Sequence, residues 1–98
     1  MIKVNMDREA IAEFCRKNGI RKLSLFGSVL TDDFGPDSDV DVLVEFEPDF
    51  HVGLIGLAGL EIDLSNIIGR KVDMRTPKDL SRYFRDKVIS SAEVRYAA

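Results

Sequence analysis

The chain has 98 residues, of which 45% are hydrophobic and 32% are charged, and this balance is typical of a globular protein with one core. Low-complexity disorder is excluded, because enough apolar surface is present to offset the conformational entropy lost on folding. The longest apolar stretch, residues 52–60, is far shorter than the roughly 20 residues that a membrane-spanning helix needs. We therefore expect a single domain over residues 1–98 and no membrane association.

The charge balance is slightly acidic. Fourteen Lys and Arg residues against seventeen Asp and Glu residues give a net charge of -3. A dedicated nucleic-acid binder needs a basic excess on one face, so direct nucleic-acid binding is not expected. Nucleotide chemistry stays open, because bound divalent cations can supply positive charge. The lone cysteine, Cys15, cannot form an internal disulfide and no signal peptide is visible, so we expect a cytoplasmic protein.

The first half of the chain predicts a helix, a short strand and a turn-rich segment. Apolar residues at helical spacing predict a helix over Asp7–Lys17, with Cys15 in its apolar stripe. Alternation then predicts a strand over Lys22–Phe26, which Gly27 ends. One helical turn at Ser28–Thr31 and further turns up to residue 38 follow.

The clearest strand in the sequence is Asp39–Phe46. Its apolar face is formed by Val40, Val42, Val44 and Phe46, and its other face by Asp39, Asp41, Leu43 and Glu45. A helix is predicted over Gly53–Ile68, with a buried stripe of Leu54, Leu57, Leu64 and Ile68. The segment Lys71–Arg75 predicts a third strand.

A last helix is predicted to begin after Thr76. Thr76 can act as N-cap, Pro77 suits the first helical position, and Asp79 lies three residues after the cap. The apolar face of this helix is expected to pack Leu80, Tyr83, Phe84 and Val88. The element order predicts an α+β fold of mixed α/β layers, in which a short mixed sheet is flanked by helices.

Three acidic residues on the predicted strands form a candidate metal site. Asp39 and Asp41 lie two apart on one strand, so their carboxylates project from the same face, roughly 7 Å apart at the backbone. Asp73 has the polarity to face the same site from the third strand. Carboxylates in such a cluster repel one another and raise one another's pKa. A divalent cation, or a pair spaced about 3.5–4 Å apart, would relieve this repulsion.

The dipeptide Gly27-Ser28 complements the acids. A glycine directly after a strand lets backbone amides approach a phosphate closely, and the serine adds a hydroxyl donor. Each feature is common by itself: Asp-x-Asp is typical of a solvated strand start, Gly-Ser of a simple turn, and Asp73 of an exposed edge. Their combination favours a site that holds a nucleoside triphosphate between the turn and the acids.

The segment LFGSVLTDDFGPDSDVDVLVEF is similar to the Gly-Ser-x10-Asp-x-Asp signature of the nucleotidyltransferase superfamily, related to the palm of polymerase β. The small size resembles the minimal nucleotidyltransferases that are paired with HEPN-domain toxins in prokaryotic toxin–antitoxin systems. The resemblance covers nearly the whole chain, through GRKVDMRTP to the final helix. It implies a small polymerase β-like nucleotidyltransferase fold.

The resemblance also implies a role for each motif residue. Gly27 and Ser28 would bind the nucleotide phosphates, Asp39 and Asp41 would bind metal, and Asp73 would be the third acid, which helps to deprotonate the attacking hydroxyl. The implied cofactor is Mg²⁺, as two ions, with ATP as substrate. One departure is that Val29-Leu30-Thr31 replaces the small or basic residues that often follow Gly-Ser in the family.

The implied reaction is transfer of AMP from ATP to a hydroxyl, a tyrosine of a cognate HEPN toxin, which silences the toxin. A chain of this length leaves little room for an acceptor site, so we expect the partner to bring its own hydroxyl. Two alternatives stay open: a non-catalytic antitoxin that neutralises the toxin by binding, and a stand-alone transferase acting on a small molecule or RNA. The sequence fixes neither the oligomeric state nor the acceptor. His51, the only histidine, is interpreted as a loop residue.

Overall fold

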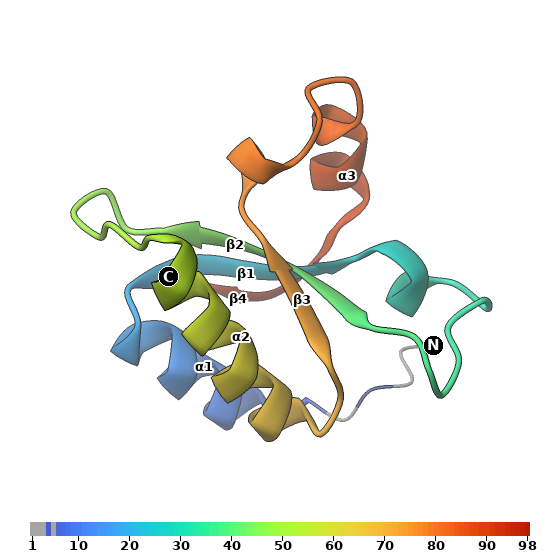
Figure 1. Cartoon of the computed structure of the whole chain (residues 1–98), viewed down its shortest axis with the longest axis horizontal. Coiled ribbons are helices and arrows are strands. Elements are labelled where there is room, and N and C mark those ends of the chain that lie inside the picture. The colour runs from blue at the N-terminus through green and yellow to red at the C-terminus, as the bar shows by residue number, and fades with distance from the viewer. Residues whose placement is uncertain (1–3, 5) are drawn as a thin grey trace.

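The structure is a computed structural model that describes residue 4 and residues 6–98. In chain order its helices (α), strands (β) and 3₁₀ turns (η) are α1 Arg8–Lys17, β1 Ile20–Phe26, η1 Gly27–Leu30, β2 Val40–Phe46, α2 Leu54–Ile68, β3 Val72–Arg75, η2 Pro77–Asp79, α3 Arg85–Ser91 and β4 Glu93–Ala97 (Figure 1). In the part of the chain that the structure describes, none of the helices has the length and apolar character to cross a membrane.

The four strands form one mixed sheet in the order β3-β2-β1-β4. β1 runs antiparallel to both β2 and β4, whereas β2 and β3 are parallel. The helices α1 and α2 lie on one face of the sheet, and η2 and α3 lie on the other (Figure 1). The prediction of a short mixed sheet flanked by helices is therefore confirmed.

The core lies between the sheet and the two helices α1 and α2. Strand alternation sends every second side chain toward it, and the central residues Val40, Val42 and Val44 are fully buried. The predicted apolar stripe of α1 is confirmed, because Ile11, Phe14 and Cys15 are all buried. Burial raises the pKa of the Cys15 thiol to about 12, as expected for a core cysteine.

The first turn of α2 differs from the prediction. Leu54 was expected in the buried stripe, but its side chain is 85% exposed, and the buried positions are Leu60, Leu64 and Ile68. Leu64 and Ile68 are buried as predicted, and Leu57 is half-buried. The segment from residue 50 to residue 60 carries no charge, so its composition gives no sign of which side faces water, and the 3.6-residue period alone placed Leu54 wrongly.

The predicted helix after Thr76 is wrong. The chain forms only the short turn η2, becomes extended at Leu80, and begins α3 after Phe84. Tyr83 and Phe84, expected to pack inward, are 79% and 63% exposed. Side-chain hydrogen bonds explain the break: Arg85 donates to the carbonyl oxygens of Pro77 (2.7 Å) and Leu80 (3.1 Å), and these bonds close a compact loop in place of a continuous helix.

The strand β4 was not predicted from the sequence. It pairs with β1, with Tyr96 opposite Leu23 and Val94 opposite Ser24. The strand is short, and none of its residues is buried. The residues Glu93–Ala97 do alternate, with apolar Val94 and Tyr96 between polar neighbours, but five residues without a buried side are a weak signal.

Candidate active site

Asp41 and Asp73 lie side by side on neighbouring strands. In the parallel pairing of β2 with β3, Asp41 is the register partner of Asp73, and on its other side Asp41 faces Phe26, the last residue of β1. Asp39 lies two residues before Asp41, just ahead of β2. The alternation of the strands places all three acids on the face opposite to the core. The structure therefore pairs Asp41 with Asp73, and Asp39 lies next to this pair along the chain.

Gly27 lies directly against Asp41. It has a φ of +76°, the left-handed conformation that favours glycine. A side chain at this position would collide with the Asp41 carboxyl group, whose Cγ lies 3.2 Å from the place that a Cβ would take and whose Oδ2 lies closer still. Two independent requirements, backbone conformation and space, thus call for glycine at the end of β1.

The turn that follows Gly27 is anchored in the core. The predicted single helical turn is present as η1, and Val29 within it is fully buried. The backbone carbonyl of Ser28 accepts hydrogen bonds from the amide and the hydroxyl of Thr31, both at 2.9 Å. The departure from the family pattern at residues 29–31 thus has a structural reason, because Val29 and Thr31 fix the turn that carries Ser28.

The electrostatics of the site are set by the burial of Asp41 and by the negative charges of its acidic neighbours. Burial raises the pKa of Asp41 above its usual range, and the negative charges of Asp73 and then Asp39 raise it further. The nearby Arg75 guanidinium acts in the opposite direction. Asp73 and Asp39 are therefore close enough to act on Asp41, and their charges make its ionisation less favourable than that of an isolated carboxyl group.

Two basic residues supply positive charge beside the acids. Arg75 donates to Asp73 through Nε, 3.2 Å from Oδ1, and through Nη2, 3.3 Å from Oδ2. Lys71 Nζ lies 3.9 Å from Asp39 Oδ2. Over residue 4 and residues 6–98, no three histidine, cysteine, aspartate or glutamate side chains converge as closely as a metal site requires. The predicted role of the three acids as metal ligands thus stays a prediction.

The donor set nevertheless suits a hard divalent cation. Asp39, Asp41 and Asp73 offer only carboxylate oxygens, the ligands that Mg²⁺ prefers. Burial and then the negative charges of Asp73 and Asp39 raise the pKa of Asp41, and a bound cation would favour its ionised form. The residues present therefore fit a magnesium site in chemistry.

Three basic residues near the acids were not predicted from the sequence to belong to the site: Arg70, Lys71 and Arg75. All three lie in the segment GRKVDMR around Asp73. The local clustering of basic residues on both sides of an acid was the available signal, but it does not show which acid each base approaches. Arg70 and Lys71 act on the segment around Asp39, which lies about thirty residues earlier in the chain.

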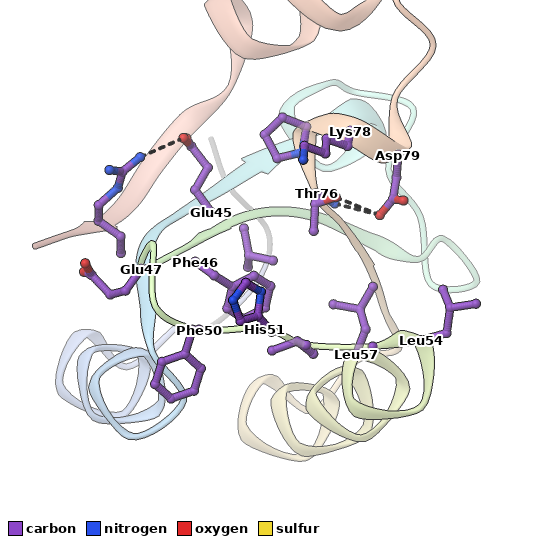
Figure 2. Close-up of a pocket in the computed structure, with 15 residues that line it drawn as sticks. Glu45, Phe46, Glu47, Phe50, His51, Leu54, Leu57, Thr76, Lys78 and Asp79 are labelled. Carbon is purple, nitrogen blue, oxygen red and sulfur yellow. Dashed lines mark hydrogen bonds and ion pairs between the residues drawn. The ribbon is translucent and has the colours of Figure 1, made fainter.

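A separate hollow lies at the other end of β2. Its volume is about 730 Å³, and its walls come from the end of β2, the start of α2 and the η2 turn (Figure 2). His51 lies in the loop that closes it, as the prediction of a loop residue requires. None of the predicted site residues lines this hollow. The acids and the Gly-Ser turn thus form a site of their own at the opposite end of the strand.

The sequence of residues 7–96 matches the family described as the nucleotidyltransferase domain. The chain therefore belongs to this family, and it is a nucleotidyltransferase. Gly27, Ser28, Asp39, Asp41 and Asp73 all lie within the matched range.

One sequence relative is a protein of Methanocaldococcus jannaschii that carries the provisional name of protein adenylyltransferase. It is 28% identical over 91 residues, which span 93% of this chain and 96% of the relative. A solved structure that is provisionally described as a minimal nucleotidyltransferase is 33% identical and has a TM-score of 0.71. The match covers 87% of this chain and 85% of that chain. The predicted fold family is thereby confirmed.

Two further solved structures share the fold at 19% identity. One is a toxin–antitoxin structure with AMP-PNP, with a TM-score of 0.75 over 95% of this chain and 75% of that chain. The other contains a tri-AMPylated Shewanella oneidensis HEPN toxin in complex with an MNT antitoxin, with a TM-score of 0.66 over 93% of this chain and 70% of that chain. At this identity the likeness shows the fold alone.

Proposed function

We propose that this protein is a magnesium-dependent protein adenylyltransferase, which transfers AMP from ATP to a tyrosine hydroxyl of a cognate HEPN-type toxin and so acts as its antitoxin. The observation that carries the proposal is the pairing of β2 with β3, which sets Asp41 beside Asp73 with Asp39 two residues away. The family membership and the AMPylated toxin bound to a protein of the same fold support the choice of reaction and partner.

Each residue of the site has a role in this reaction. Asp39 and Asp41 would hold the magnesium ions, which supply Lewis-acid polarisation of the phosphates when bound. The hydroxyl and backbone amide of Ser28 donate hydrogen bonds to phosphate oxygens. At Gly27 no side chain separates the turn from Asp41, so phosphate and carboxylate can approach the same point.

The chemical step is an in-line displacement at phosphorus. The acceptor oxygen attacks the α-phosphorus of ATP, the bond to the oxygen that bridges the α- and β-phosphates breaks, and pyrophosphate leaves. The hydroxyl proton passes to the Asp73 carboxylate, whose hydrogen bonds from Arg75 hold it in place beside Asp41. The acceptor tyrosine comes from the partner.

The test is a transfer assay with ATP labelled at the α-phosphorus, Mg²⁺ and a HEPN-type partner. We expect label on the partner, no label from γ-labelled ATP, and loss of transfer when the partner's tyrosine is replaced by phenylalanine. Asp39→Asn combined with Asp41→Asn should lower transfer by at least about 1000-fold, because the metal ligands are lost. Glu45→Gln is the matched control, since Glu45 lies further along β2 and pairs with Arg21.

The same assay separates the alternatives. If the double asparagine variant transfers no label but still neutralises the toxin, neutralisation depends on binding and not on catalysis. If the wild-type protein labels RNA or a small molecule but not the partner, it is a stand-alone transferase. Absence of any transfer by the wild-type protein would overturn the proposed activity.

A further inference from the structure

Arg70 connects the end of α2 to a loop that lies 32 to 35 residues earlier in the chain. It follows Gly69, whose φ of 78° ends the helix in a left-handed turn, and precedes β3. Its half-buried side chain reaches the loop of residues 34–38, between η1 and β2. This loop joins the two halves of the site, the Gly-Ser turn upstream and Asp39 downstream.

The guanidinium group of Arg70 gathers the backbone of that loop. Nη2 donates to the carbonyl oxygens of Gly35 and Ser38, both at 2.8 Å, and lies 3.3 Å from that of Pro36. Its Cζ lies 4.5 Å from the centroid of the Phe34 ring, and Phe34 is only 4% exposed. The loop is thus held by the Arg70 guanidinium group, which itself lies over the buried ring of Phe34.

These contacts bear directly on Asp39. The carbonyl of Ser38 belongs to the peptide unit that joins Ser38 to Asp39, so its hydrogen bond to Arg70 orients the backbone that carries the carboxylate. On the other side, the amide of Val40 donates to the carbonyl of Lys71 at 2.8 Å. Asp39 therefore lies between two peptide units that are both anchored to the segment Arg70–Lys71.

We propose that Arg70 is a positioning residue for the transfer reaction: it holds the loop of residues 35–38 so that Asp39 projects beside Asp41 in the geometry that binds the cation. This inference rests on the proposed function, because it assigns Asp39 a metal. Arg70 acts through the backbone and contacts neither substrate nor cation. A displacement of Asp39 by about 1 Å is enough to lower the rate by about 100-fold.

Arginine suits this task better than lysine. Its planar group combines stacking on Phe34 with several directed N–H donors, whereas an ammonium group offers a point charge on a flexible stem. Arg70→Lys should therefore retain part of the effect, through hydrogen bonds to the carbonyls of Gly35 and Ser38. Arg70→Met keeps the length of the side chain and removes every donor.

The first measurement is amide hydrogen exchange, followed by NMR on the protein alone. The Ser38 amide donates to the carbonyl of Gly35 at 3.1 Å, inside the loop that Arg70 holds. We expect the exchange of this amide to be about 10-fold faster in Arg70→Met and intermediate in Arg70→Lys, because the loop opens more often without the Arg70 guanidinium group. Arg16→Met, on the exposed side of α1, is the matched control and should leave this exchange unchanged.

The second measurement is binding of Mn²⁺, followed by electron paramagnetic resonance, together with steady-state kinetics. Arg70→Met should weaken Mn²⁺ binding by about 10-fold and lower kcat by about 10- to 100-fold, with a smaller change in the KM for ATP, since the Gly-Ser turn is not displaced. Arg70→Lys should recover part of kcat. A loss of stability alone would not split kcat from KM in this way.

The inference and the proposed function fail separately. If Arg70→Met is folded and matches Arg16→Met in both Ser38 exchange and Mn²⁺ binding, Arg70 positions nothing and the inference is wrong. If the wild-type protein transfers no nucleotide, the proposed function fails, while exchange and Mn²⁺ binding still decide the role of Arg70. If Arg70→Met does not fold, the same comparison is made between Arg70→Lys and Arg16→Lys.

Discussion

Apolar residues are regularly spaced both in the strands that carry the acids and in the stretch from Thr76 to Ala98. Only in the strands are these apolar side chains buried. In β2, Val40, Val42 and Val44 are fully buried. In the C-terminal stretch, Tyr83 and Phe84 are mostly exposed. The comparison teaches that a period reports burial only where other elements cover that side of the chain.

The two regions are held by different forces. β2 lies between β1 and β3 and is covered by the helical layer of α1 and α2, so burial of its apolar side chains stabilises it (Figure 1). The part of the C-terminal stretch before β4 lies on the outer side of the sheet (Figure 1). Hydrogen bonds that Arg85 donates and Asp79 accepts set its local path. Substitutions of the same kind should therefore have very different effects in the two regions.

The largest expected difference is between two phenylalanines. Phe14→Ala, in the core of α1, should lower the free energy of unfolding by about 3–5 kcal/mol, because it removes a ring that is 5% exposed and leaves a cavity. Phe84→Ala should change it by less than about 0.5 kcal/mol, because the ring is mostly in solvent. Urea unfolding measures both. Equal losses would show that Phe84 packs in solution and would break the comparison.

The fold was predictable where local pattern and burial agree. The alternation in β2 and the helical spacing in α1 each identified an element and its buried side. The same reasoning failed at Leu54 and Tyr83 for one reason: whether an apolar side chain is covered depends on elements distant in sequence. Spacing along the chain contains no information on that cover.

The second expected effect concerns Gly27, at the edge of the acid site. Gly27→Ala should cost about 1–2 kcal/mol for the left-handed backbone, and the collision with Asp41 should add to this. Displacement of the carboxylate should also lower nucleotidyl transfer by about 100-fold. Gly69→Ala separates the two causes, because Gly69 has a similar φ of +78° but nothing within 4 Å of the added Cβ. Equal losses of stability in the two variants would contradict the collision.

The site was predictable to the extent that its residues lie in one short motif. Gly27, Ser28, Asp39 and Asp41 fall within fifteen residues, and their spacing carried the chemistry. The contacts of Arg70 and Lys71 were not predictable, because they depend on the parallel pairing that brings β3 beside β2. Register between strands distant in sequence is decided by packing of the whole sheet.

A smaller effect is expected in the C-terminal stretch, where one local signal did hold. Asp79 Oδ2 accepts hydrogen bonds from the amide of Thr76 (3.1 Å) and from its hydroxyl (3.0 Å), as the predicted capping residues require. Asp79→Ala should lower the free energy of unfolding by about 0.5–1 kcal/mol. Asp86→Ala, in the exposed first turn of α3, is the control. If Asp79→Ala leaves the free energy of unfolding unchanged, the turn is held by Arg85 alone.

The smallest expected effect concerns the influence of Arg75 on the pKa of Asp41. Burial and the charges of Asp73 and Asp39 raise the pKa of Asp41 in the folded protein, and Arg75 opposes them. A carboxyl whose pKa is raised on folding contributes stability at low pH, which is lost as the pH rises through the folded pKa. Arg75→Gln should raise this pKa further, so the variant loses more stability than the wild-type protein between acid and neutral pH.

This difference is measured by urea unfolding at several pH values in the presence of a chelator of divalent cations. The exposed pair of Arg75 with Asp73 is itself worth at most about 1 kcal/mol, so the pH dependence is the informative quantity. Lys71→Gln is the matched control, because Lys71 lies beside Asp39 and not beside Asp41. In the wild-type protein, added Mg²⁺ should make the free energy of unfolding rise with pH instead of falling, since a bound cation favours the ionised carboxylates. If Mg²⁺ leaves the pH dependence unchanged, the three acids hold no magnesium, and the difference between the two regions is one of packing alone.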